Sequence, residues 1–407
     1  MKQLSRIWIL IAAMAAVALV GAPDAAADNR GFIYGTVETE SGNTYRGILR
    51  WGTEESFWDD HFNSSKKDLP YRKRGRGDGG RRSRIKVFGV TVGYRWDDSW
   101  GGRQFISRFG DITSVEIRGG DDLELVMKGG ERIALEGGSN DVGARITVLD
   151  ESLGEVKVEW KRIERIVFSA TPPDVKAPAR RLYGVLTTED DEKFEGYIQW
   201  DIQECLWTDE LDGETEDGDL SIEMGKIRAI EKRNRHGAWV ELKDGRRLLL
   251  EDTNDVDHTT DGIFVEDRRY GRVEVPWDAF ARLDFQEVAH TGPGYDEYKP
   301  GRGLRGTVTD DEGRKYGGEI VFDLDESRDW ELLNGERFDI EYHIPFSMVR
   351  SIERLGRDSS LVRLRNGEIV ELEDGTDVSD DNAGVLVMGP ESEDFVAWED
   401  LKLLELE

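Results

Sequence analysis

Short segments in which apolar and polar residues alternate run along most of this chain, and turn residues separate them. Residues 239–250 contain two such segments joined by Asp244-Gly245, and residues 360–372 contain two joined by Asn366-Gly367. These dipeptides favour a type I′ β-hairpin, whose two central residues need a positive φ. Beyond residue 27, no segment keeps a helical hydrophobic period for three turns. The pattern therefore predicts an all-β protein.

The predicted strands fall into three diverged copies of one repeat of about 115 residues. Each copy opens on a strand led by glycine, and these glycines are Gly35, Gly184 and Gly306. A second glycine and a pair of aligned aromatic residues follow, and we align the pairs as Trp51/Trp58, Trp200/Trp207 and Phe322/Trp330. Each copy closes on a tryptophan and spaced apolar residues, at Trp160, Trp277 and Trp398. Matches in one fixed order indicate internal duplication.

Apolar residues spaced three apart end both halves of each copy, which predicts a short 3₁₀ turn before a closing strand. Each half then reads as four short strands, one such turn and a closing strand in about 50 residues. This build resembles the architecture of small SH3-like or Sm-like barrels, in which a bent sheet closes on itself. We therefore expect two consecutive barrel modules per repeat. The alternative is one two-sheet β-sandwich per repeat.

The N-terminus and the repeat together set the expected domain boundaries. Residues 1–27 read as a signal peptide, because Lys2 and Arg6 flank an apolar run and small residues precede an expected cut after Ala27. We expect the remaining chain in the periplasm or outside the cell, with no integral membrane segment. Its predicted units are repeat 1 (28–170, with an insertion over 64–106), a linker (171–180), repeat 2 (181–287), a linker (288–302) and repeat 3 (303–407).

Composition narrows the range of partners and chemistry. The formal net charge of −30 disfavours nucleic acid as a partner. Cys205 is the only cysteine, and its neighbours Leu206 and Trp207 predict a packed thiol. The five histidines do not align between copies, and no familiar catalytic motif is present. We therefore expect a protein that is not an enzyme.

The repeated aspartates Asp141, Asp255 and Asp377 are the most informative polar positions. Each follows Asn or Thr before a turn, where an aspartate often bonds nearby backbone. The functional alternative is calcium, which prefers hard oxygen ligands. The candidate calcium ligands are Asp252, Asp255, Asp257, Asp261, Asp374, Asp377, Asp380 and Asp381. Copy one lacks the additional carboxylates near Asp141.

Copy one is longer than the others, and the start of its insertion is strongly basic. Gly35 and Gly184 are 149 positions apart, against 122 for Gly184 and Gly306. The segment could lie against the acidic repeats, or it could be an arm that grips an anionic partner. A further strand or hairpin is expected over residues 85–94. The basic residues of the arm are Lys66, Lys67, Arg72, Lys73, Arg74, Arg76, Arg81, Arg82, Arg84 and Lys86.

Repetition without a repeated catalytic constellation favours an exported envelope protein that binds or scaffolds a protein or a glycan. The aligned tryptophans are expected in the core, although exposed rows of them could stack on sugars. The first alternative is a purely structural protein stabilised by calcium, and the second is an enzyme of unfamiliar design. The sequence leaves the oligomeric state open.

Overall fold

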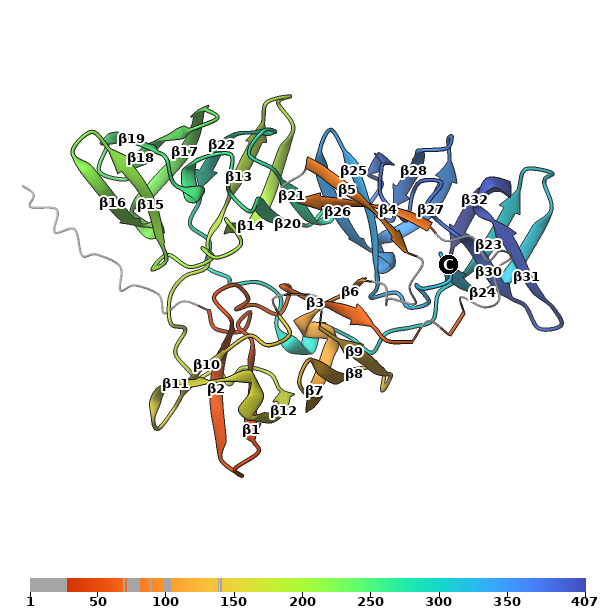
Figure 1. Ribbon diagram of the computed structural model, residues 1–407, viewed down its shortest axis with the longest axis horizontal. Helices are drawn as coiled ribbons and strands as arrows, with labels where there is room; N and C mark the ends of the chain where they lie inside the picture. Colours follow the sequence, from red (N-terminus) through yellow and green to blue (C-terminus); the bar gives the residue numbers. More distant parts are fainter. Residues whose placement is uncertain are drawn as a thin grey trace, which may run out of the picture.

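The computed structural model describes residues 28–68, 70–71, 81–87, 90–97, 104–137, 139 and 141–407. In these ranges every regular element is a β-strand or a single 3₁₀ turn, so the all-β prediction is confirmed. The same ranges hold no helix long and apolar enough to span a bilayer. In Figure 1, repeat 1 lies below, repeat 2 at the upper left and repeat 3 at the right.

Repeat 2 forms one antiparallel arrangement of ten strands. Its strands are β13 (Tyr183–Thr188), β14 (Lys193–Trp200), β15 (Glu210–Thr215), β16 (Gly218–Glu223), β17 (Ile227–Asn234), β18 (Gly237–Leu242), β19 (Arg247–Glu251), β20 (Ile263–Asp267), β21 (Gly271–Val275) and β22 (Phe280–Phe285). They pair in the order β21-β20-β14-β13-β22-β17-β18-β19-β15-β16.

Repeats 1 and 3 have the same strand order as repeat 2. Repeat 1 contains β1 (Tyr34–Thr39), β2 (Thr44–Trp51), β3 (His61–Lys66), β6 (Gln104–Arg108), β7 (Ile112–Gly119), β8 (Asp122–Met127), β9 (Arg132–Glu136), β10 (Ile146–Asp150), β11 (Gly154–Val158) and β12 (Ile163–Phe168). Repeat 3 contains β23 (Arg305–Asp310), β24 (Lys315–Phe322), β25 (Leu332–Arg337), β26 (Ile340–Pro345), β27 (Val349–Arg354), β28 (Ser359–Leu364), β29 (Ile369–Glu373), β30 (Gly384–Met388), β31 (Glu393–Ala397) and β32 (Leu401–Leu406). The insertion of repeat 1 forms a separate hairpin of β4 (Arg81–Val87) and β5 (Val90–Asp97). In the sequence this hairpin lies between β3 and β6.

The strand pairing differs from two consecutive modules per repeat. In repeat 2, β14 pairs with β20 near the end of the copy, whereas β15 pairs with β19. The first two and last three strands therefore form one half of the sheet, and the five strands between them form the other. Gly196 helps to explain why β14 pairs with β20, because a Cβ at this position would lie 2.0 Å from the Glu266 carbonyl oxygen of β20. The missing side chain lets two distant strands approach each other.

Two local predictions can be checked directly. The 3₁₀ turns expected in mid-repeat are present as η2 (Phe109–Asp111), η4 (Met224–Lys226) and η7 (Phe346–Met348), so this prediction is confirmed. The hairpins at Gly245 and Gly367 also form, but the type I′ prediction is wrong. Only the glycine of each turn has a positive φ, at 92° and 98°, because the loops are longer than two residues.

The three repeats pack into one another. Strand β21 pairs with β26, which joins repeats 2 and 3 in one sheet. The core of repeat 1 also takes in Cys205, Leu206 and Trp330 from the other repeats. The aligned tryptophans are buried except Trp207, which is half-buried, so their assignment to the core is confirmed.

One aligned tryptophan is out of register. The Phe57 amide donates to Asp60, and the Arg328 amide makes the same contact with Glu331. Asp329 therefore occupies the position of Trp58, and Trp330 follows it. The one-residue shift turns Trp330 toward the core of repeat 1, where its ring meets Phe105.

Candidate ligand-binding cleft between the repeats

A cleft of about 490 Å³ opens where the second linker meets all three repeats. Its walls include Asp59 and His61 from repeat 1, Arg272 from repeat 2 and His343 from repeat 3, and Tyr298 of the linker also lines it. Clefts between packed units are common places for ligands, because several elements can each contribute a polar group. We call this feature the junction cleft.

Buried ion pairs fix the floor of the junction cleft. The Arg181 guanidinium donates to both carboxylate oxygens of Asp59, at 2.7 and 2.9 Å. The Arg272 guanidinium donates to Asp60 at 3.1 Å and also contacts Glu266. All of these carboxylates except Glu266 belong to repeat 1, whereas both arginines belong to repeat 2. The network therefore ties two repeats together and holds the cleft in one shape.

Histidines and aromatic rings supply the rest of the wall. The rings of His61 and His343 meet edge to face, with centroids 5.7 Å apart. Burial lowers the pKa of His61 well below its ordinary value and lowers that of His343 to about 4, so both are neutral at physiological pH. The Arg108 guanidinium lies over the Tyr298 ring, 5.3 Å from its centroid.

The mouth of the junction cleft combines rings with exposed cations. Tyr183 and Tyr197 meet edge to face at 5.3 Å, and both rings are half-buried. Arg30 and Arg268 are exposed beside them. Tyrosine offers an apolar ring with a polar tip, and arginine offers several donors in a fixed plane. Such a mouth can hold a polar ring molecule that carries hydroxyl or acidic groups.

The residues of the predicted basic arm lie in different environments. Lys66 is not part of an exposed arm, because its ammonium is buried between Asp325 at 2.7 Å and Glu331 at 3.0 Å. Lys67 pairs with Asp122 near the surface. Arg72, Lys73, Arg74 and Arg76 lie outside the described residues, and Arg81, Arg82, Arg84 and Lys86 lie on β4, of which only the backbone is described. Lys66 thus acts within the chain, whereas the role of the other residues stays a prediction.

The candidate calcium ligands are regrouped by the fold. Asp255 lies with Asp201 and Glu204, and Asp377 lies with Asp323 and Glu326. Copy one has the equivalent group, formed by Glu54, Glu55 and Asp141, so the expectation that it lacks further carboxylates is wrong. The second and third carboxylates come from the turn that follows an earlier strand, which the spacing around the repeated aspartate could not reveal.

The other predicted calcium ligands do not join these groups among the described residues. Asp261 contacts the Asp255 group only through its backbone amide, which donates to Asp201 at 2.5 Å. Asp380 instead pairs with Arg357 at 2.7 Å. Asp252 and Asp374 are exposed in turns, and Asp257 lies beside two histidines. Asp381 is half-buried and falls outside the Asp377 group.

The repeated aspartates have one structural contact in common. Each accepts a hydrogen bond from the backbone of a strand elsewhere in its own repeat, at 2.6 Å for Asp141 and 2.7 Å for Asp255 and Asp377. Burial raises the pKa of Asp141 and of Asp255 to about 7. It raises the pKa of Glu204 to about 9. The groups of Asp141 and Asp255 therefore bind protons near neutral pH, and all three aspartates anchor strands.

Comparison with known proteins adds little to this geometry. No protein-family model matches the chain, and no curated protein matches it. A solved structure titled "Streptogramin B lyase structure" aligns over 86% of this chain and 99% of its own, at 10% identity and a TM-score of 0.12. A similarity at that level carries no argument about fold or function.

Sequence reasoning missed the junction cleft entirely. Its residues come from positions that do not align between copies, since His61 and His343 lie on non-equivalent strands. Cys205, by contrast, is a packed thiol as predicted, and burial raises the pKa of that thiol.

Proposed function

We propose that this chain is an exported, non-catalytic binding protein that holds a glycan in the junction cleft. The observation that carries the proposal is the cleft itself, in which half-buried tyrosine rings stand beside exposed arginines above a floor of fixed ion pairs. The C–H faces of sugars pack on aromatic rings, and their hydroxyl oxygens accept hydrogen bonds from donors such as arginine. Only four large apolar side chains of the described chain are strongly exposed (Leu153, Phe338, Leu355 and Ile369), and none of them lines the cleft, which favours a glycan over a protein ligand there.

The binding proposal is tested with a chain that begins at residue 28 and a panel of neutral and acidic envelope oligosaccharides. Calorimetry should detect one site for at least one of them. Tyr183→Ala and Arg268→Ala should each weaken binding about tenfold or more. Tyr316→Ala and Arg246→Ala are matched controls outside the cleft and should leave it unchanged. Absence of any binding at millimolar sugar, or equal effects of the two pairs of variants, would overturn the proposal.

An enzyme is the second candidate, and one observation favours it. The junction cleft gathers three histidines, His61, His290 and His343, with Asp59 and Glu266. Those carboxylates are already paired with arginines, and Nδ1 of His343 is 2.8 Å from the Asn334 side-chain oxygen. These contacts favour binding over proton transfer. If the parent chain converts a bound sugar into a product and His343→Asn does not, the enzyme becomes the favoured candidate.

The calcium-stabilised structural protein remains a further alternative. It is supported by three equivalent carboxylate groups, one in each repeat. A melting temperature that rises by several degrees with millimolar calcium would favour it, because an ion that binds only the folded state stabilises that state. A melting curve unchanged by calcium and by chelator would eliminate it.

A further inference from the structure

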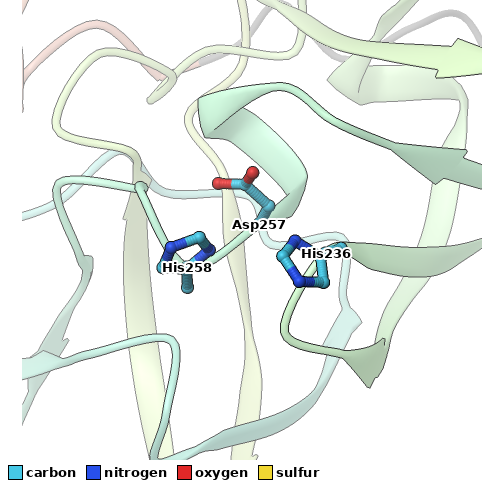
Figure 2. A group of neighbouring side chains, drawn as sticks. All are labelled: His236, Asp257 and His258. Carbon is cyan, nitrogen blue, oxygen red and sulfur yellow. The ribbon is translucent and has the colours of Figure 1, made fainter.

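A second group of side chains, separate from the junction cleft, has the composition of a transition-metal site. His236 lies in the turn between β17 and β18, and Asp257 and His258 follow the 3₁₀ turn η5 (Asn254–Val256). Figure 2 shows the three side chains gathered at one place from these two loops. One potential ligand atom from each residue lies within 4.8 Å of those of the others.

Backbone contacts hold the two loops together without using the side chains. The His258 amide donates to the Arg235 carbonyl at 3.0 Å, and the Asp252 amide donates to the His236 carbonyl at 3.2 Å. Asp257 is only 8% exposed, and its Oδ1 accepts two hydrogen bonds from Thr259, at 2.7 and 2.6 Å. The carboxylate is thereby oriented, as metal-ligating carboxylates usually are.

The imidazole of His258 supplies the observation that points to a ligand. Its Nδ1 is buried and has no hydrogen-bond partner in the described structure. A buried polar atom without a partner costs about 1–3 kcal/mol, so such atoms usually have an ion, a water or a role. His236 is exposed and its ring meets that of His258 edge to face at 5.5 Å, which leaves one side of the group open to solvent.

The donor set selects the class of ion. Two imidazoles and one carboxylate suit zinc, copper, nickel and iron, whereas calcium and magnesium prefer oxygen ligands alone. Bonds of about 2.0–2.1 Å place the ligands of a tetrahedral zinc ion about 3.3 Å apart. The exposed His236 ring can turn to reach that spacing. With three protein ligands, a fourth position is left for water or another ligand.

The equivalent loops of the other repeats do not share this donor set. In repeat 3, Asp380 stands three residues after Asp377, as His258 does after Asp255, and Asp380 pairs with Arg357. In repeat 1 the matching residue is Ala144. A guanidinium therefore stands beside a carboxylate in repeat 3 where two histidines stand in repeat 2. The chain thus contains its own comparison, because this pair of histidines is present in repeat 2 alone.

We propose that His236, Asp257 and His258 bind one divalent transition-metal ion, with zinc as the representative ion. The proposal is independent of the glycan site, because none of these residues lines the junction cleft. The site belongs to repeat 2 alone. It also differs from the carboxylate groups that repeat in all three copies.

The proposal is tested by titrating an untagged, chelator-treated chain that begins at residue 28 with zinc. We expect one site whose affinity falls at least tenfold in His236→Ala and in His258→Ala. His290→Ala, which changes an exposed histidine elsewhere, should leave the affinity unchanged. With copper(II), nitrogen hyperfine splitting in the electron paramagnetic resonance spectrum should report imidazole ligands and disappear in the double histidine variant.

Folding is followed separately so that a damaged variant is not mistaken for a lost ligand. The metal-free His236→Ala variant should melt like the parent chain, since the side chain is exposed. Zinc binding that survives both histidine variants, or a copper spectrum without nitrogen splitting, would overturn the proposal. So would no zinc binding at 100 µM.

Discussion

Glu274 of β21 and Glu341 of β26 stand directly opposite each other across the strand pair that joins repeats 2 and 3. Two carboxylates in such positions repel one another when both are ionised. Burial, with the charge of Glu341 as the next cause, raises the pKa of Glu274 to about 8. The junction between these repeats therefore holds a proton at neutral pH.

The proton on Glu274 makes the stability of the protein depend on pH. Because its pKa is raised by folding, its contribution is complete below about pH 4.5 and is lost as the pH rises through 8. Glu274→Gln imitates the protonated form. At pH 9 we expect this variant to be more stable than the parent by about 4–5 kcal/mol, and at pH 4 to match it. Urea unfolding at both pH values measures the difference, and Glu319→Gln, which changes an exposed glutamate of β24, is the control. Equal stability of Glu274→Gln and parent at pH 9 would contradict the assignment.

Two neighbouring glycines of β24 should differ strongly in the stability that the same substitution costs. A Cβ on Gly318 would lie 2.4 Å from the Met388 carbonyl oxygen, whereas one on Gly317 would have no neighbour closer than 3.7 Å. Gly318→Ala must push β24 and β30 apart and should cost about 3 kcal/mol. Gly317→Ala should change the free energy of unfolding by about 0.5 kcal/mol or less. Thermal and urea unfolding compare the pair, and a similar cost for both would show that the close approach is not what requires Gly318.

Local features of the fold were accessible from the sequence, whereas its long-range pairing was not. Asp244-Gly245 marks a hairpin because the turn depends on neighbouring residues alone. The pairing of β14 with β20 joins strands about 65 residues apart. The alternation of apolar and polar residues in β14 does not say which distant strand will be its partner. The repeated glycine of β14, Gly196, can be found in the sequence. Only the structure shows that the backbone of β20 approaches it closely.

The candidate sites were predictable to a still smaller degree. Asp141, Asp255 and Asp377 were found because they repeat, yet the carboxylates beside them come from another loop. His236 and His258 lie 22 positions apart and do not repeat. A basic run such as the one containing Lys66 looks exposed in a sequence, because the acidic partners Asp325 and Glu331 come from a different repeat. Sites made between elements need the tertiary structure.

Lys66 should be far more important for stability than its neighbour Lys67. Its ammonium is buried with two carboxylates, so Lys66→Ala leaves uncompensated charges and should cost about 3–5 kcal/mol. Lys67 pairs with Asp122 where both side chains are partly exposed, so Lys67→Ala should cost about 1 kcal/mol or less. Urea unfolding of the two variants gives the comparison.

A double variant separates the lost ion pairs from a simple loss of packing. Lys66→Met with Asp325→Asn should recover part of the stability lost in Lys66→Met, because one unpaired charge is removed. If Lys66→Ala costs no more than Lys67→Ala, the ammonium does not join repeats 1 and 3. Losses that simply add in the double variant would show that Asp325 is not its partner.

The repeated aspartates should tolerate an amide but not truncation. Asp255 accepts the Asp212 amide at 2.7 Å, and its pKa of about 7 shows that the neutral form is easily held. Asp255→Asn keeps an acceptor and should match the parent below about pH 3.8, where Asp255 is protonated in both the folded and the unfolded chain. Because a raised pKa means stability lost as the pH rises from 3.8 through 7, the variant should exceed the parent above pH 8. Asp255→Ala removes the acceptor of the part-buried bond from the Asp212 amide and should cost about 1–2 kcal/mol at every pH. Melting curves with calcium and with chelator complete the test, since a bound calcium ion would reverse the order of parent and Asp255→Asn in its presence.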